Sequence, residues 1–478
     1  MPRISREDEI MLTATLPMAW YVGVDVGTAS VRAGLVDRDG TVHAWASEEI
    51  RVHQPQAGRY EQDSQDVWRA CCHVVRNLPD SWKKAWHFFD LPDFLTWKAT
   101  GSLTRSLCCV VCKWTYNVDS GWDQSFWDEI GLSDICQEGY SRIGVDFLGP
   151  GQPLSGGLTM HAADELGLQP GTAVGAALID AHAGTIGVIG GDVTGLGLAC
   201  ESQPITARLS MIGGTSTCHM ALSDKALFVG GVWGPYLSVV LPGLWLNEGG
   251  QSATGSLIEH IVAGHPAYNE LKKIADASGQ STYEWLNRRV VSMATEGAPP
   301  ATLTSDLHVC PDFHGNRSPL ADSSRKGMVI GLDLSRTCDS LVLLYLATLQ
   351  ALALGTRHIL NAMTQSGHNV SAIFMCGGLS KNSLYVQAHA DATGLPVVLP
   401  AEAEAVVVGA AILGACASKD FTSMQEAMQH MVRVGKVIHP DPAVRSFYER
   451  KYKVYMLMGR NQLEYRSLMS SADHHANS

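Results

Sequence analysis

The chain has 478 residues, of which 46% are hydrophobic and 17% are charged, and its formal net charge is −12. This composition excludes a disordered chain, and the length favours two domains over a single core. A chain this acidic is a poor candidate for binding nucleic acid or an anionic membrane. The charge does not exclude a local phosphate site, because backbone N–H groups can bind anions without net positive charge.

The 12 cysteines are scattered and lack the density of a secreted disulfide scaffold. Cys109 and Cys112 have CxxC spacing, but no second pair follows, so two buried thiols are favoured over a metal or redox role. The first 20 residues mix acidic and basic side chains without a long apolar run, so no secretory signal is expected. No uninterrupted apolar run reaches the ~18 residues of a membrane span. We therefore expect a reduced, cytoplasmic setting.

The first predicted elements are three strands joined by short turns, at residues 19–26, 31–36 and 41–50. Gly40 supplies the positive φ that the second turn needs. A helix is expected at 64–75. No clear strand separates that helix from the next apolar segment, HFFDLPDFLTWKATG.

The second half of the chain alternates strands and helices, which predicts an α/β fold. We expect an apolar strand at 171–180 that ends on Asp180 and leads into a helix, followed by a strand, turn and strand within 208–220. Further on we expect helices at 339–365, 383–393 and 404–417, strands at 371–376 and 396–399, and a frayed polar end after Met458. A strand, Gly-Thr turn and returning strand occur twice, which suggests two related domains facing each other across a cleft.

The two Gly-Thr turns are candidates for binding phosphate. Phosphoryl transfer needs donors around the phosphate oxygens, a metal held by carboxylate, and a carboxylate that accepts the proton of the attacking hydroxyl. Glycine lets the backbone approach a phosphate, and threonine adds a hydroxyl donor. Asp25, at the end of the first strand, could hold Mg²⁺. The alternative for both turns is an ordinary hairpin. The candidate residues are Gly27 and Thr28 in the first turn and Gly214, Thr215 and Ser216 in the second.

A third candidate follows the strand at 371–376, where GGLSKN opens a helix. Gly377, Gly378 and Asn382 stand where backbone N–H groups could bind a nucleotide. The segment matches neither the P-loop spacing nor GxGxxG, and the second mismatch argues against a dinucleotide enzyme.

Asp180 stands where the apolar strand meets a helix. A helix N-terminus would favour negative charge there, as a proton acceptor requires. The alternative is a helix N-cap, since Asp is a favoured capping residue. His182 is expected to be a packing residue rather than a base.

Taken together, these segments resemble the FGGY carbohydrate kinases. The similarity runs in the right order from about Trp20 to Tyr455. It is carried by GVDVGTASVRAGLVDRDG, LPDFLTWKATG, LIDAHAGTIGVIG, MIGGTST, HGNRSPLAD and FMCGGLSKNSLYVQAHADATGLPV followed by EAEAVVVGAAILGA. The resemblance implies two ribonuclease H-like domains of the actin, hexokinase and heat-shock chaperone superfamily around a cleft.

The resemblance also implies roles for particular residues. Asp180 would be the catalytic base, Thr28 and Thr215 would contact phosphates, and ATP and Mg²⁺ would be the cofactors. Gly377, Gly378 and Asn382 would line the adenosine pocket. Trp245, Gln251 and Arg317 would be substrate or cleft contacts, although Arg317 could equally form a structural ion pair. PGLWLNEGGQSATG is most similar to the ribulokinase branch, which implies transfer to a terminal hydroxyl of a pentulose such as D-ribulose.

The expected partners are accordingly a sugar and ATP, with a homo-oligomer possible. The expected domains are 18–200 and 205–458, with flexible ends at 1–17 and 459–478.

The sequence departs from the family pattern near 76–87, where a block with a central strand and a Trp-x-Asp-x-Arg type substrate motif is missing. We therefore expect a shortened, truncated first domain, as in a splice form. Loss of a central strand uncovers strand edges, and loss of sugar positioning would slow phosphoryl transfer. The alternative to a kinase is thus a catalytically impaired nucleotide-binding or regulatory variant. An actin-like or chaperone-like ATPase with a protein partner is disfavoured by HGNRSP and NEGGQS.

Overall fold

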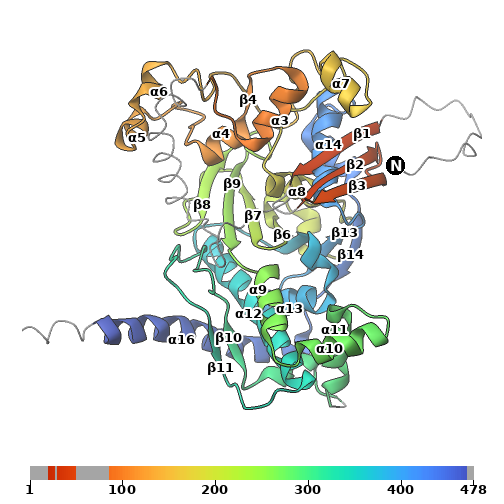
Figure 1. Cartoon of the computed structure of the whole chain (residues 1–478), viewed down its shortest axis with the longest axis vertical. Coiled ribbons are helices and arrows are strands. Elements are labelled where there is room, and N and C mark those ends of the chain that lie inside the picture. Colours follow the sequence, from red (N-terminus) through yellow and green to blue (C-terminus); the bar gives the residue numbers. More distant parts are fainter. Residues whose placement is uncertain (1–19, 27–29, 50–85, 296, 471–478) are drawn as a thin grey trace, which may run out of the picture.

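The structure is a computed structural model that describes residues 20–26, 30–49, 86–295 and 297–470. A sheet of seven strands lies at the centre of the molecule, in the order β14-β13-β12-β6-β7-β9-β8 (Figure 1). Its strands are β6 (Arg208–Gly213), β7 (Thr217–Ser223), β8 (Trp233–Leu237), β9 (Trp245–Gln251), β12 (Ala372–Cys376), β13 (Val397–Pro400) and β14 (Val434–Ile438). Strand β12 runs parallel to β6, whereas β7 runs antiparallel to it. The predicted α/β class is confirmed.

Helices cover both faces of this sheet. Helix α8 (Asp180–Ile189), with α14 (Ala405–Ala417) packed on it, covers one face. The other face carries α9 (Gly255–Gly264), α12 (Cys338–Gln365) and α13 (Ser383–Thr393). Successive strand residues point to opposite faces. Ser210 therefore meets α8, while its neighbours Leu209 and Met211 enter the core shared with α12.

Helices α8 and α14 approach each other closely because both present glycine at the crossing. A side-chain carbon at Gly409 would overlap the carbonyl oxygen of Ala183, and one at Gly187 would overlap that of Ala405. The small-residue composition of both predicted helices is thus explained by backbone-to-backbone packing.

The N-terminal strands form a separate antiparallel sheet of β1 (Trp20–Val26), β2 (Ser30–Asp37) and β3 (Val42–Glu49). These bounds agree with the three predicted strands, and Gly40 has the expected positive φ of 77°. Strand β1 lies along α14 (Figure 1). The helix predicted at 64–75 lies outside the described residues.

Short elements occupy the segment between this sheet and α8. They are α3 (Leu91–Thr100), β4 (Arg105–Ser106), α4 (Leu107–Lys113), α5 (Gln124–Glu129), α6 (Ser133–Gln137), β5 (Phe147–Leu148) and α7 (Met160–Leu166). Strands β4 and β5 pair in parallel. In Figure 1 most of this segment lies above the central sheet, at the end where α4 approaches β8.

The remaining helices and strands are α10 (Tyr268–Ala277), α11 (Thr282–Met293), β10 (His308–Cys310), β11 (Met328–Ile330), α15 (Met424–Met431) and α16 (Arg445–Ser470). Of these, α15 packs against α14 and α8, and the others lie on the α12 side. Among the described residues, α12 alone is long and apolar enough to cross a membrane, and 72% of its most apolar window is buried inside the protein. Burial on this scale is what a core helix shows.

Two sequence predictions are wrong. Residues 172–179 form no strand but an extended segment with one isolated bridge, between Gly175 and Pro153. Its hydrogen-bonding partner, residues 152–158, contains a proline and two glycines at positive φ, Gly156 and Gly157, which interrupt a regular ladder.

The chain also does not fray between Met458 and Ser470. Helix α16 continues to Ser470, because buried Gln462 exchanges two hydrogen bonds with the backbone of Lys326.

Candidate active site

Helix α8 runs antiparallel to β6. At the start of the strand, Arg208 donates to the carbonyl oxygen of Ile189, the last residue of the helix, at 2.8 Å. In the middle, the hydroxyl of Ser210 donates to that of Thr185 at 2.8 Å. The first residue of α8 therefore lies toward the end of β6 that leads into the turn at 213–216.

That first residue is Asp180, and its side chain is exposed. The N-cap position belongs to Ile179, and among the described residues the carboxylate accepts from its neighbour alone, through Oδ1 and the N–H of Ala181 at 2.8 Å. Asp180 is therefore not the cap of α8, and no donor in the described part of the chain reaches its second oxygen.

The turn after β6 and the turn after β12 meet at one end of the sheet. In the parallel register, Ile212 lies opposite Cys376, so the residues that follow them are neighbours. Gly377 has φ +86°, and a side-chain carbon there would overlap the carbonyl oxygen of Gly213. Two of the predicted nucleotide-binding turns, far apart in sequence, are thus brought into contact.

The start of α9 supports the first of these turns. Thr254 N–H donates to the carbonyl oxygen of Thr215 at 2.9 Å, and Gly255 N–H donates to that of Gly214 at 3.1 Å. Beneath the turn, the buried hydroxyl of Thr217 donates to that of Thr254 at 2.9 Å. The carbonyl groups therefore point into the protein, while Gly214 and Thr215 are exposed and Ser216 is partly exposed.

Asn382 is held in a polar network behind the second turn. Its side chain caps α13 by accepting from the N–H of Tyr385 at 3.2 Å, and it donates to the hydroxyl of Tyr345 at 2.6 Å. Asn287 donates to it at 3.1 Å. Asn382 thus positions the turn and the start of α13, which the sequence argument did not anticipate.

The predicted substrate contacts Trp245 and Gln251 are the two ends of β9. Trp245 is half-buried opposite Ser223 in the strand register. Gln251 points away from α8 and donates to the carbonyl oxygen of Leu352 in α12 at 2.8 Å. In this structure Gln251 therefore supports the core rather than facing Asp180.

Arg317 forms an ion pair, the alternative left open by the sequence. Its Nη2 lies 2.7 Å from Oε1 of Glu248, and its guanidinium lies over the ring of Trp233 at 4.3 Å. The other carboxylate oxygen of Glu248 lies 3.3 Å from Nε2 of His182 in α8. On the far side of the imidazole, Nδ1 lies 3.0 Å from the sulfur of Cys108 in α4. We call Cys108, His182, Glu248 and Arg317 the buried polar chain.

The electrostatics of this chain follow from its pairing. Burial raises the pKa of Glu248, but His182 and Arg317 outweigh burial and lower the pKa to about 2. Burial lowers the pKa of His182, but Cys108 and Glu248 raise it to about 10. Burial, with Glu248 and Asp180 nearby, raises the pKa of the Cys218 thiol to about 12. The chain thus joins α8 to the sheet beside Asp180 through a carboxylate that stays ionised.

Sequence reasoning missed Glu248, although it lies in the quoted segment NEGGQS. A carboxylate within a buried strand needs a charged or hydrogen-bonding partner, and that was the available signal. Residues 248 and 251 lie on opposite faces because side chains alternate along a strand. Of the first phosphate turn, Gly27 and Thr28 lie outside the described residues, and Asp25 stands in β1 opposite Arg32.

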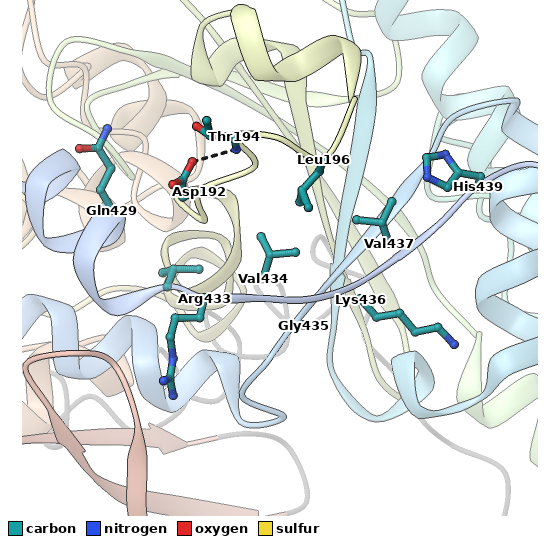
Figure 2. Close-up of a pocket in the computed structure, with 11 residues that line it drawn as sticks. Asp192, Thr194, Leu196, Gln429, Arg433, Val434, Gly435, Lys436, Val437 and His439 are labelled. Atoms are coloured by element: carbon teal, nitrogen blue, oxygen red, sulfur yellow. Dashed lines mark hydrogen bonds between the residues drawn. The ribbon is translucent and has the colours of Figure 1, made fainter.

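A pocket of about 650 Å³ lies elsewhere, beside the edge strand β14, and none of the predicted site residues lines it (Figure 2). Two of its polar side chains are already engaged. Asp192 accepts from the N–H of Thr194 at 2.9 Å, and Arg433 pairs with Glu402 at 3.1 Å. We therefore assign the candidate site to the converging turns and Asp180, not to this pocket.

Comparisons with known proteins establish the family of the chain. The FGGY family of carbohydrate kinases matches with its N-terminal domain at residues 20–82 and its C-terminal domain at 209–418. The FGGY carbohydrate kinase domain-containing protein of Danio rerio is 50% identical over 539 residues, which covers 94% of this chain and 99% of that protein. A D-ribulokinase of Saccharomyces cerevisiae is 32% identical over an alignment that covers 85% of this chain and 73% of the yeast protein. The xylulose kinase of Rhodospirillum rubrum has a similar fold, with TM-score 0.71, 20% identity, and coverage of 94% of this chain and 99% of that chain.

The chain belongs to the FGGY family of carbohydrate kinases, which are phosphotransferases that act on sugars and use ATP. The family resemblance in the motifs is confirmed, and so is the fold class. Residues 83–208, between the two matched segments, are matched by neither domain of the family. The alignment with the Danio rerio protein is longer than this chain, so part of that protein has no counterpart here.

Proposed function

We propose that the protein transfers the γ-phosphate of ATP to a terminal hydroxyl of a pentulose, with D-ribulose as the leading acceptor. The observation that carries this proposal is the meeting of the Gly213 and Gly377 turns at the end of the sheet where α8 begins with Asp180. The 32% identity to a yeast protein named D-ribulokinase supports the choice of sugar.

In the proposed reaction, Asp180 accepts the proton of the attacking sugar hydroxyl, because it is an exposed carboxylate with one oxygen free of protein donors among the described residues. The hydroxyl of Thr215 and the backbone of Gly214 and Ser216 bind phosphate oxygens. Gly377 and Gly378 line the adenosine pocket, which Asn382 holds in shape.

Mg²⁺ would neutralise the phosphate charge during transfer. We propose that Asp25 would hold the Mg²⁺ ion, because it lies one residue before the end of β1 and the first Gly-Thr turn follows.

We propose the domain division at about residues 200–205 and a shortened first domain. A longer relative with unmatched residues supports the shortening, as does the failure of 172–179 to join a sheet. These observations also favour a second candidate function, a nucleotide-binding variant that turns over slowly because it holds the sugar poorly.

The test is release of ADP from ATP in the presence of D-ribulose, L-ribulose, D-xylulose or glycerol. We expect D-ribulose to give the highest kcat/KM, and Asp180→Asn to lower kcat by about 10²–10⁴-fold. Asp164→Asn, at an exposed aspartate of α7, is the matched control and should leave the rate unchanged.

Binding of ATP, measured by calorimetry, separates the two candidate functions. ATP binding without turnover on any of the four acceptors would select the nucleotide-binding variant. Turnover that survives Asp180→Asn would contradict the catalytic assignment.

A further inference from the structure

Two cysteines and a histidine from different helices converge beside the buried polar chain. Cys108 and Cys112 are four residues apart on α4, so both thiols lie on the same face of that helix. His182 approaches them from α8. The three candidate ligand atoms all lie within 4.8 Å of one another, and Nδ1 of His182 is 3.0 Å from the Cys108 sulfur.

The sequence motif marks a different pair, for which buried thiols were expected rather than a metal site. Cys109 and Cys112 have CxxC spacing, but Cys109 is not part of this cluster. Its backbone N–H bonds to Ser106 at the start of α4. Helical periodicity, rather than the sequence motif, selects which thiols meet.

The surroundings of His182 supply an independent observation. A histidine that binds a metal through one ring nitrogen usually donates through the other to a carboxylate, which fixes the ring orientation. Here Glu248 lies 3.3 Å from Nε2, and Arg317 holds Glu248 from behind at 2.7 Å. The imidazole is therefore already oriented with Nδ1 toward the sulfur atoms.

We propose that Cys108, Cys112 and His182 form a Zn²⁺ site that joins α4 to α8. Two thiolates and an imidazole suit zinc, and a fourth position would be left for water or another exogenous ligand. Cys108 and His182 are fully buried, but Cys112 is partly exposed, which gives an ion a route of entry. Binding forms three bonds to the metal and releases the protons of both thiols and of Nδ1 to solvent.

The site is distinct from the Mg²⁺ site of phosphoryl transfer, since it uses sulfur ligands, and it does not rest on the proposed function. It would tie the segment before α5 to the helix that begins with Asp180, two residues from His182. Bound metal should therefore stabilise the packing of α4 against α8, because an ion that binds only the folded state shifts the folding equilibrium by mass action.

The experiment uses the full-length protein, reduced and stripped of metal, and titrates it with Co²⁺ and with Zn²⁺. We expect a thiolate-to-cobalt charge-transfer band with one equivalent of Co²⁺, its displacement by Zn²⁺, and a higher Tm in Zn²⁺. Cys112→Ser, at a partly exposed position where folding is expected to survive, should abolish the band. Glu248→Gln should weaken binding by about 10–100-fold.

Cys338→Ser is the matched control, because Cys338 is also partly exposed but lies at the start of α12. It should keep the band and the full equivalent of metal. The proposal is overturned if the wild-type protein shows no charge-transfer band. It is also overturned if Cys112→Ser binds the same number of equivalents as Cys338→Ser with equal affinity, since the metal then resides on other groups.

Discussion

The hydroxyl of Ser210 in β6 donates a 2.8 Å hydrogen bond to the hydroxyl of Thr185 in α8, and both side chains are completely buried. Thr185 in turn donates to the carbonyl oxygen of Ala181, one turn earlier in the helix. This contact sets the direction of α8 along the sheet. It therefore helps to place Asp180 toward the end of β6 that leads into the turn at 213–216.

Removing the Ser210 hydroxyl should lower the free energy of unfolding. Ser210→Ala leaves the Thr185 oxygen without its donor in a buried site, at a cost of about 1–3 kcal/mol. A double-mutant cycle with Thr185→Val, measured by urea unfolding, should show a coupling of about 1 kcal/mol. Strict additivity of the two substitutions would show that the contact contributes nothing.

Gly409→Ala should destabilise the protein, because the added carbon overlaps the Ala183 carbonyl oxygen where α8 and α14 cross. Overpacking of this kind costs about 1–3 kcal/mol. Gly414→Ala in the same helix is the control, since no atom lies within 4 Å of its added carbon. It should stabilise by up to about 1 kcal/mol through helix propensity. Equal effects of the two substitutions in thermal unfolding would argue against close packing of these helices.

Gly377→Ala should weaken ATP binding at least about tenfold, corresponding to 1.4 kcal/mol, because it combines a left-handed φ with an overlap of the Gly213 carbonyl. The same substitution should also lower stability. Gly378→Ala has open space around its added carbon and no positive φ, so its effect on unfolding should be small. Calorimetry with ATP and chemical denaturation check both points. A Gly377→Ala protein with unchanged affinity would place the nucleotide elsewhere.

Asp93 predicts a specific pH dependence. Burial raises its pKa from 3.8 to about 7, although the N–H of Ser106 donates to it at 2.7 Å. Because the folded protein holds the proton more tightly than the unfolded chain, this group destabilises the fold progressively as pH rises from about 4 to about 7. Asp93→Asn keeps the acceptor and removes the titration.

The stability of Asp93→Asn relative to the wild type should therefore rise over that window, by a few kcal/mol in total, and level off above it. Urea unfolding at several pH values measures the difference. Burial lowers the pKa values of His219 and His389 to about 3 and about 4, so these residues make both proteins more stable as pH rises. Comparing the variant with the wild type removes their contribution and isolates that of Asp93. A difference that is flat with pH would mean that Asp93 titrates normally.

Local pattern was enough to predict most elements of the second half. The helix predicted at 383–393 has those bounds in the structure, and the strand predicted at 371–376 differs by one residue. Such elements are encoded by periodicity and by turn residues that act over a few positions. The segment at 172–179 has an equally apolar pattern, but whether it forms a strand depends on a partner elsewhere in the chain.

The sequence by itself determined the order of the phosphate-type turns, the glycines that permit them, and Asp180 at a helix start. These are local properties of the backbone, and their ordered combination was sufficient to indicate a carbohydrate kinase. Only the tertiary structure decided that Gly377 touches Gly213, that Gln251 faces α12 while Glu248 faces His182, and that Cys112 meets Cys108 and His182 rather than pairing with Cys109. The physical reason is that these contacts depend on strand register and on the packing of helices on a sheet, which join residues tens to hundreds of positions apart.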